Sequence, residues 1–311
     1  MTKNPNQIRD REIITAFVIG LAIAYLRYNA IDKGNDLIWP LCAARQLLAG
    51  HDPYGSTCLS HSPDGYVWAV YPITTVITTL PFSLMNDKLA ATVLLSVAGG
   101  LLAYGLIRRG GLGMLIVFLS FPAIETMQYA QWTFLIPAIG FIPALYPLTT
   151  IKPHVALPVV ITLLTRRRLI VLAIIGIISL VLLPSWLWQW LNLATTYAGY
   201  LPLLTISGML LLPLMFVWRR HDARYVLLAA LAPQRAMYDA MILTVALRST
   251  FDAAVWTLLT WILLFLTIRL GVDLPNRHVI AAYVPVAVLT GIRLIRRSDL
   301  RSSEVNNDCD V

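Results

Sequence analysis

Long apolar segments recur along almost the whole chain, each about 15 to 22 residues long, close to the roughly 20 residues that a helix needs to cross a bilayer core. Backbone amides have no water to bind inside a bilayer, so such segments must satisfy their hydrogen bonds as helices. Of the 311 residues, 58% are hydrophobic and 13% are charged, whereas about a quarter are charged in soluble domains. We therefore expect an all-α, polytopic membrane bundle with about 8 to 11 membrane segments, including broken or re-entrant helices.

The chain is expected to form one transmembrane domain over residues 1–298, followed by a polar, disordered tail over residues 299–311. The longest polar segment inside the domain is the first loop, residues 32–70, which we expect outside the cytoplasm. Because the apolar segments leave no room for a soluble domain, the function must reside inside the helical bundle and in this loop.

The first loop contains a segment, residues 37–49, with the pattern of an amphipathic helix. An interfacial helix buries its apolar side chains among the lipids, while its charged and amide side chains stay in water. Arg45 and Gln46 are expected on the wet face. The side chains expected to meet lipid are Leu37, Trp39, Leu41, Leu47 and Leu48.

The basic residues occur in blocks, and each block ends an apolar segment, within a formal net charge of +8. The blocks are Arg108–Arg109, Arg166–Arg168, Arg219–Arg220 and Arg293 with Arg296 and Arg297. Lysine and arginine concentrate on the cytoplasmic side, so the blocks and the basic N-terminus are expected there, with residues 13–30 as an uncleaved anchor. Nucleic-acid binding is not expected, because the blocks contain no interleaved aromatic side chains.

Residues 71–85 conflict with this orientation if they cross the membrane completely. A full span there would return Arg108 and Arg109 to the outside. The segment is short and contains Pro72 and Pro81, which makes it the suspected incomplete span. A short true span followed by two external arginines is the alternative.

A second conflict arises at residues 225–247, which would place Arg248 outside if they crossed once. The last basic block would then also lie outside, against the usual charge distribution. We expect instead a broken hairpin whose apex is residues 232–239, with Pro233 as the breaker.

Short polar islands interrupt the apolar runs. An ionisable group at membrane depth costs at least about 2.5 to 3.5 kcal/mol on insertion scales, so it normally faces a polar cavity or a partner. Arg235 and Asp239 either neutralise each other or line a hydrophilic cleft. Lys152 either extends to a lipid headgroup or faces that cleft. The islands comprise Glu125, Gln128 and Gln131, then Lys152 and His154, then Arg235 and Asp239.

A series of short motifs follows in order along the chain: ND at 35–36, AARQLLAGHDPY at 43–54, YP at 71–72, AQWTFL at 130–135, KP at 152–153 and YD at 238–239. This series resembles the membrane glycosyltransferases of the GT-C superfamily, and most closely glycosyltransferase family 87, the polyprenyl-phosphate-mannose-dependent α-mannosyltransferases. The first-loop motif is its most specific part, and AQWT stands where a G-Q-x-N-like turn is expected.

The resemblance implies a GT-C-like fold in the cell membrane, with the site facing the non-cytoplasmic side. It implies transfer of a sugar, mannose in the closest family, from a polyprenyl-phosphate donor to a lipid or glycan acceptor hydroxyl. Membrane lipids would surround the protein, and no metal or other cofactor is expected, because the donor phosphate is a single diester and no carboxylate pair has ligand spacing.

Such a transfer requires a base that takes the acceptor proton while the anomeric carbon develops positive charge, and a carboxylate can do both. The resemblance implies that Asp36 is this catalytic residue. The alternative is that Asp36 only caps the amphipathic segment that follows it. Asp52 is expected to form the turn before Pro53, where it could also orient His51.

The leaving phosphate requires fixed cations, which arginine supplies as a bidentate fork and lysine as a point charge. Together with the motif residues, this defines the expected substrate-binding set. Its members are Lys152, His154, Arg235, Gln131, Tyr71, Asp239 and Tyr54.

Cys42 and Cys58 share the first loop, and the sequence leaves open whether they form a disulfide. It also leaves open a different class of function, either a transporter of lipids or lipid-linked sugars or a catalytically silent scaffold on the same fold. An enzyme needs Asp36 beside a cleft open to lipid, whereas a transporter needs a path across both faces.

Overall fold

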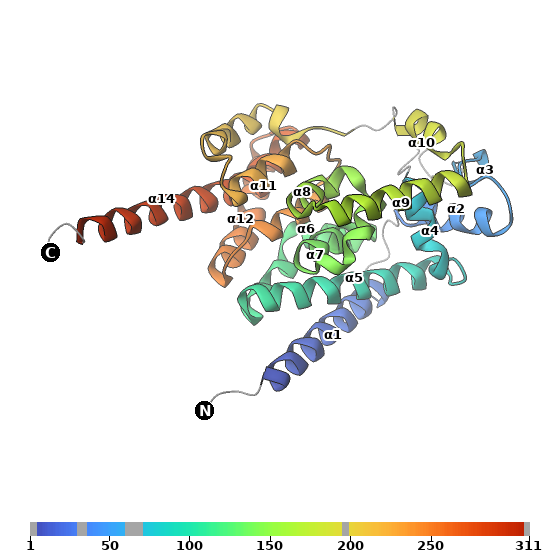
Figure 1. Cartoon of the computed structure of the whole chain (residues 1–311), viewed down its shortest axis with the longest axis horizontal. Helices are drawn as coiled ribbons and strands as arrows, with labels where there is room; N and C mark the ends of the chain where they lie inside the picture. The colour runs from blue at the N-terminus through green and yellow to red at the C-terminus, as the bar shows by residue number, and fades with distance from the viewer. Residues whose placement is uncertain (1–4, 30–35, 60–70, 195–198, 308–311) are drawn as a thin grey trace.

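The computed structural model describes residues 5–29, 36–59, 71–194 and 199–307. The secondary-structure elements within these ranges are all helices (Figure 1). The prediction of an all-α chain is therefore confirmed. In Figure 1 both termini lie toward the left, whereas three helices of the opposite side lie toward the right. These three are α2 (Ile38–Leu48), α3 (Ser56–Leu59) and α10 (Trp186–Ala194). We call their side the loop end.

Four helical runs are long and apolar enough to cross a membrane. They are α1 (Pro5–Asn29), α5 (Asp87–Gly110), α12 (Thr250–Arg269), and the run of α13 (Leu274–His278), the π-helix η8 (Val279–Tyr283) and α14 (Val284–Asn307). Two bent pairs pass the same test, namely η2 (Leu112–Leu119) with α6 (Phe121–Tyr129), bent by 65°, and α9 (Arg166–Leu182) with α10, bent by 101°. The chain thus has four candidate spans, or six if each bent pair counts as one.

Shorter apolar helices fill the remaining membrane-like sequence. They are α4 (Ile73–Thr79) with η1 (Leu80–Phe82), η3 (Trp132–Phe134) with α7 (Leu135–Phe141), α8 (Pro153–Leu163), η6 (Ser207–Val217) and η7 (Met237–Ala246). At about 1.5 to 2.0 Å per residue, such helices cover roughly half to two-thirds of a 30 Å core. The expected 8 to 11 segments are therefore a mixture of candidate spans and shorter helices. The other elements are η4 (Pro143–Ile151), η5 (Pro202–Leu204) and α11 (His221–Ala230).

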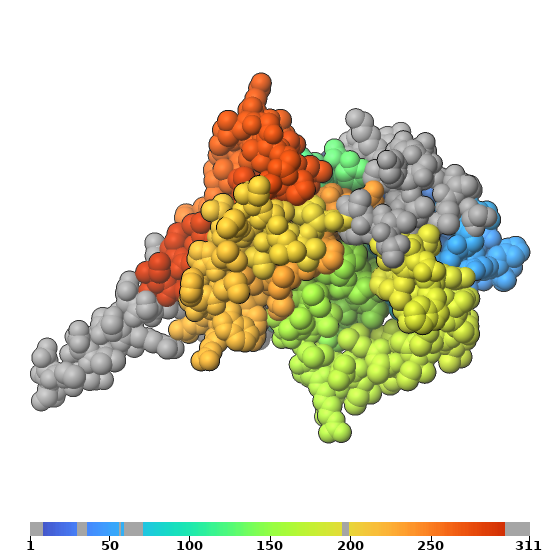
Figure 2. All heavy atoms as spheres, turned by 90° about the horizontal axis from the view of Figure 1, so that it is seen from above, coloured from blue at the N-terminus to red at the C-terminus, as the bar shows by residue number. Residues whose placement is uncertain are grey.

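Large apolar side chains cover much of the outer surface. Phe17 of α1, Val181 of α9 and Phe216 of η6 are 65%, 75% and 93% exposed. Figure 2 shows α9, in yellow-green, along one edge of the molecule. Extensive apolar exposure is unfavourable in water but normal against lipid. The surface is therefore compatible with an integral membrane protein.

Helices α1 and α5 lie side by side in close contact. A Cβ atom at Gly20 would come within 2.7 Å of the Ser96 carbonyl oxygen, and one at Gly100 within 3.2 Å of the Ala16 carbonyl oxygen. Small residues let two membrane helices approach until their backbones touch, which is how such helices gain packing energy in lipid. The glycines therefore fix α1 against α5, and α1 leads directly into the first loop.

Basic residues from several segments gather at the end opposite the loop end. Arg108 lies 4.0 Å from Glu12 of α1, and Arg293 of α14 lies 3.1 Å from Asp252 of α12. Arg248 forms an ion pair with Asp222 of α11. We call this side the basic end; it contains arginines of two of the predicted blocks, Arg108 and Arg293.

Residues 71–85 do not form a full span. Helix α4 with η1 covers only Ile73–Phe82. The residues that follow η1 lie at the loop end, where Arg45 of α2 donates to the carbonyl oxygens of Ser83 and Met85 at 3.0 and 2.8 Å. Asp87 then pairs with Arg45 at 2.8 Å, so α5 starts at the loop end and runs to the basic end. By length and composition this segment is a shorter apolar helix and not a candidate span, as the interpretation of an incomplete span expects.

Residues 225–247 form the expected broken hairpin. Helix α11 leads away from the basic end and η7 leads back to it. The two are in contact, since the Tyr225 hydroxyl donates to the Ile242 carbonyl oxygen at 3.1 Å. The two ends meet where Arg248 bonds Asp222. The break lies at residues 231–236, which include Pro233, so the apex returns the chain to the basic end.

Helix α2 differs from its expected role. Leu37, Trp39 and Leu41 are buried in protein rather than facing outward, whereas Leu48 is 59% exposed. The Trp39 ring packs against Tyr54 at a centroid distance of 5.6 Å. The prediction that all five apolar side chains meet lipid is therefore wrong, because α3 and α4 cover the apolar face of α2.

The polar tail also differs from the expectation. Helix α14 continues to Asn307, so most of the segment expected to be disordered is helical, and residues 308–311 lie outside the described residues. Figure 1 shows α14 projecting beyond the bundle.

Candidate active site

The site lies where the first loop meets the end of α6. The Asp36 backbone amide donates to the Tyr129 carbonyl oxygen at 2.9 Å, which anchors the loop on this helix. Ala130 is the C-cap of α6, and its φ of 50° lies in the left-handed region. This conformation costs an L-residue about 1 to 2 kcal/mol and favours glycine. Alanine therefore occupies a turn that a glycine of a G-Q-type motif would form with less strain.

Asp36 is not a helix cap. The N-cap position of α2 is Leu37, which has helical backbone angles and no side-chain capping bond. The Asp36 carboxylate instead accepts a hydrogen bond on Oδ2 from Gln131 Nε2, and the Tyr238 hydroxyl lies 3.5 Å from the same oxygen. The capping alternative is therefore wrong, since the carboxylate points toward residues far away in the sequence.

Gln131 connects Asp36 to two further predicted residues. Its side chain is 1% exposed. Its Oε1 atom accepts from the Tyr71 hydroxyl at 3.2 Å and from Lys152 Nζ at 3.2 Å. One buried amide thus links the first loop, the start of α4 and the turn before α8.

Lys152 and Asp239 form a buried ion pair. Lys152 Nζ lies 2.6 Å from Asp239 Oδ1, and their side chains are 5% and 0% exposed. Lys152 therefore does not extend to a lipid headgroup. The ion pair of Asp239 is with Lys152, and Arg235 contacts Asp239 through its backbone amide at 3.2 Å. A buried pair of this kind is stable only with further hydrogen bonds, which Gln131 supplies.

Arg235 and His154 lie beside this network. Burial raises the pKa of Asp36, and the positive charges of Lys152 and then Arg235 oppose this rise, so both cations interact electrostatically with the carboxylate. His154 is half-buried in the first turn of α8, in electrostatic range of Lys152 and Asp239. The structure thus brings the predicted residues together, with His154 at the edge.

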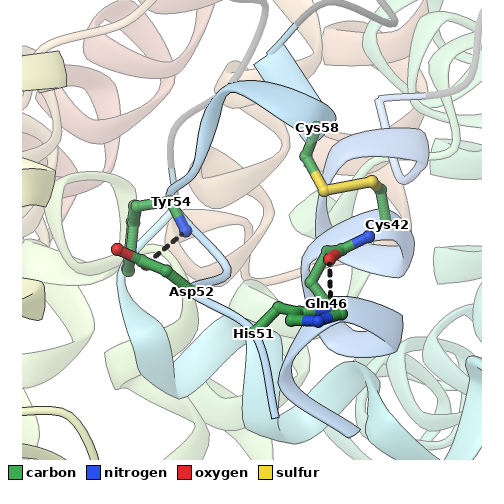
Figure 3. The surroundings of a disulfide bond; sticks show 6 residues. All are labelled: Cys42, Gln46, His51, Asp52, Tyr54 and Cys58. Atoms are coloured by element: carbon green, nitrogen blue, oxygen red, sulfur yellow. Dashed lines mark hydrogen bonds between the residues drawn. A yellow bond between two sulfur atoms is a disulfide. The ribbon is translucent and has the colours of Figure 1, made fainter. Parts of the chain in front are cut away.

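Tyr54 supports the network from the first loop. Its hydroxyl donates to the Tyr71 carbonyl oxygen at 3.0 Å, and its backbone amide donates to Asp52 Oδ1 at 2.9 Å (Figure 3). The turn-forming role of Asp52 is confirmed. His51 instead contacts Gln46 Oε1 at 3.1 Å, so the suggestion that Asp52 orients His51 is wrong.

A disulfide closes this part of the loop. Cys42 of α2 and Cys58 of α3 are bonded, with 5.7 Å between their Cα atoms, across a sequence separation of 16 residues (Figure 3). The loop is further tied to α10, because Gln189 Nε2 donates to Asp52 Oδ2 at 2.7 Å. These bonds hold Tyr54 in place and answer the question that the sequence left open.

Sequence reasoning missed the roles of two site residues. Glu125 of α6 accepts on Oε2 from the Tyr238 backbone amide at 2.6 Å, and so binds one of the first free amides of η7. The Tyr238 ring packs 4.9 Å from Lys152 Nζ. Glu125 stood out as a charge in an apolar segment, but its partner lies 113 residues away, so no local pattern identifies the pair.

Burial raises the pKa of the Asp36 carboxyl from 3.8 to about 6, against the lowering effects of Lys152, Arg235 and the Gln131 hydrogen bond. Asp36 lies in the first loop, outside the candidate spans. A carboxyl with this pKa is largely ionised at neutral pH and still basic enough to accept a proton. The arrangement can therefore perform base chemistry at the loop end.

Within the described ranges, no group of three or more His, Cys, Asp and Glu side chains could hold a metal ion. Cations near the site are Lys152 and Arg235, which can bind or stabilise anionic oxygens. The sequence matches no protein-family model, and no curated protein and no solved structure is significantly similar to the chain.

Proposed function

We propose that the chain is a membrane glycosyltransferase of the GT-C type, which moves a sugar from a polyprenyl phosphate to a hydroxyl of a lipid or glycan. Mannose is the sugar that the sequence resemblance favours. The observation that carries the proposal is the position of Asp36. This loop carboxylate caps no helix and is held by a buried amide that also contacts the Lys152–Asp239 pair.

Asp36 acts as the general base in this proposal. It takes the proton of the acceptor hydroxyl as that oxygen bonds to the anomeric carbon of the donor sugar. The bond from the anomeric carbon to the phosphate oxygen breaks, and the phosphate leaves with the electron pair. The negative carboxylate also stabilises the positive charge that develops on the sugar ring.

Arg235 is the cation that we assign to the leaving phosphate. It lies at the apex of the broken hairpin, half-buried, with its charge in range of Asp36. A guanidinium can bind two phosphate oxygens at once, and a fixed donor of this kind stabilises charge that appears only during the reaction. His154 lies close enough to contribute to the same pocket.

The loop end is assigned to the non-cytoplasmic side. Arg108, Arg248 and Arg293 gather at the opposite end, which the charge rule for membrane proteins assigns to the cytoplasm. The Cys42–Cys58 disulfide supports the same orientation, because disulfides persist in oxidising compartments and are rare in the cytosol. A lipid-linked donor would then react at the outer face.

An enzyme fits the described residues better than a transporter. Below Asp239, η7 continues with Ala240, Met241, Ile242 and Leu243, which are each no more than 1% exposed. A polar path that continued to the basic end would need hydrophilic side chains along this helix. The four residues that follow Asp239 on η7 therefore provide no polar path toward the basic end.

The experiment that tests this function uses vesicles containing the purified full chain. They are incubated with radiolabelled polyprenyl-phosphate mannose and with lipid extract as the acceptor source. The proposal expects a new labelled lipid or glycan that is absent from empty vesicles. Movement of the labelled donor across the bilayer without a new product would favour the transporter.

A further inference from the structure

The Gln131 amide is held between two hydrogen-bond donors and one acceptor. An ammonium group can only donate, so the amide atom that faces Lys152 must be the oxygen. The Tyr71 hydroxyl donates to the same oxygen, and both distances are 3.2 Å. The amide nitrogen is thereby turned toward Asp36 Oδ2. A flipped amide would set its NH₂ group against an ammonium and its oxygen against a carboxylate.

We propose that Gln131, clamped by Lys152 and Tyr71, is a positioning residue that keeps Asp36 ionised and reserves its Oδ1 atom for the acceptor proton. Among the described residues, both side chains bonded to the carboxylate contact Oδ2, namely Gln131 and Tyr238. A donor that binds the charged form favours ionisation. The assignment of Oδ1 as proton acceptor rests on the proposed glycosyltransferase function, whereas the effect on ionisation does not.

The clamp changes the expected role of Lys152. A phosphate that bound Lys152 Nζ would have to displace Asp239, which lies 2.6 Å away in a pair almost closed to solvent. Loss of one partner from a buried ion pair is strongly unfavourable. Lys152 therefore acts through Gln131 rather than on the donor.

The test is an infrared titration of the purified full chain in lipid nanodiscs. The band of the protonated Asp36 carboxyl is assigned by its loss in Asp36→Asn, and its intensity is followed against pH. Gln131→Met keeps the side-chain length and removes the amide. The ratio of protonated to ionised Asp36 at a given pH should rise roughly tenfold or more, because a hydrogen bond to a charged group is lost. Tyr71→Phe should give a smaller rise, because Lys152 still holds Oε1.

Gln128→Met is the matched control. Gln128 lies on α6, three residues before Gln131, and in the described part of the chain its side chain has no hydrogen bond to Asp36. Its titration should match the wild type. An unchanged titration in Gln131→Met would overturn the clamp, and a shift toward more ionised Asp36 would show that the amide is flipped. Tyr71→Phe keeps the test valid if Gln131→Met does not fold.

Transfer assays separate this inference from the proposed function. If the wild type transfers mannose, the pH at which the transfer rate falls on the acidic side should be higher in Gln131→Met. This increase should equal the shift in the infrared titration of Asp36. If the titration shifts but the wild type transfers no sugar, the clamp stands and the glycosyltransferase proposal fails. If transfer depends on Asp36 but the titration does not shift, only the clamp is wrong.

Discussion

Asp36 is half-buried, and this burial raises the pKa of its carboxyl to about 6. Two nearby cations and one amide oppose the shift, so the group remains ionised at neutral pH. A base whose pKa lies slightly below the working pH is mostly ionised and still binds a proton readily. The same burial destabilises the ionised form of the folded protein, because the folded pKa exceeds the unfolded value of 3.8.

The rate of transfer should depend on pH through this one group. Below a pH of about 6 the rate should fall about tenfold per pH unit, because only ionised Asp36 can accept the proton. Above that pH the rate should reach a plateau. Initial rates between pH 4.5 and 8, measured at saturating acceptor, check this, and a rate that is flat across pH 5 to 7 would contradict it.

The candidate residues could be found from the sequence, but most of their partners could not. Charges in apolar segments are conspicuous, which is why Lys152, Asp239 and Arg235 stood out. Lys152 and Asp239 are 87 residues apart, so pattern alone could not choose between a long-range pair and the local Arg235–Asp239 pair. The N-cap of α2 was equally ambiguous in the sequence, because Asp36 lies only one residue before the N-cap residue Leu37.

The short elements around the site depend on proline and on tight turns. Helix α4 begins after Pro72, α8 begins at Pro153, and the hairpin breaks near Pro233. These breaks were predictable, because proline cannot continue the backbone hydrogen bonds of a helix. The covered face of α2 was not, because lipid and protein interior are equally apolar, and amphipathicity cannot tell which of them an apolar face meets.

The disulfide between α2 and α3 should stabilise the first loop. Replacing Cys42 and Cys58 together with serine opens a loop with a sequence separation of 16 residues, for which loop-closure entropy predicts a loss of about 3 kcal/mol. The melting temperature should fall, and the wild type should fall equally after reduction. Cys309→Ser is the control and should melt as the wild type does. Equal melting of the double variant and the wild type would exclude a stabilising role.

At the scale of the molecule, the bundle has a polar site at one end and arginine clusters at the other. Apolar length and charge blocks were sufficient to predict an all-helical chain with apolar helices compatible with a membrane, and they identified the short helix at residues 73–82 and the hairpin at residues 225–247. Among the described residues, the 8 to 11 expected segments comprise four to six candidate spans and five shorter apolar helices. The length of an apolar run in the sequence does not show where proline ends the helix within it.

The orientation of the hairpin is tested by cysteine labelling in intact cells, in a Cys309→Ser background. Arg248→Cys should react with a membrane-impermeant maleimide only after the membrane is opened, because Arg248 bonds Asp222 at the basic end. Arg220→Cys reports the basic end, and His51→Cys reports the loop end and should react in intact cells. Labelling of Arg248→Cys together with His51→Cys would contradict the hairpin orientation.

The most direct test of the proposed function compares Asp36→Asn with Asp52→Asn in the mannose transfer assay. Asparagine preserves the size of Asp36 and removes the base, so transfer should fall by about 100-fold or more. The melting temperature at pH 7.5 should stay the same or rise, because the burial of a charge is relieved. Asp52→Asn, whose carboxylate binds Tyr54 and Gln189 in the loop, should retain most of the activity. Wild-type rates of transfer in Asp36→Asn would contradict the account.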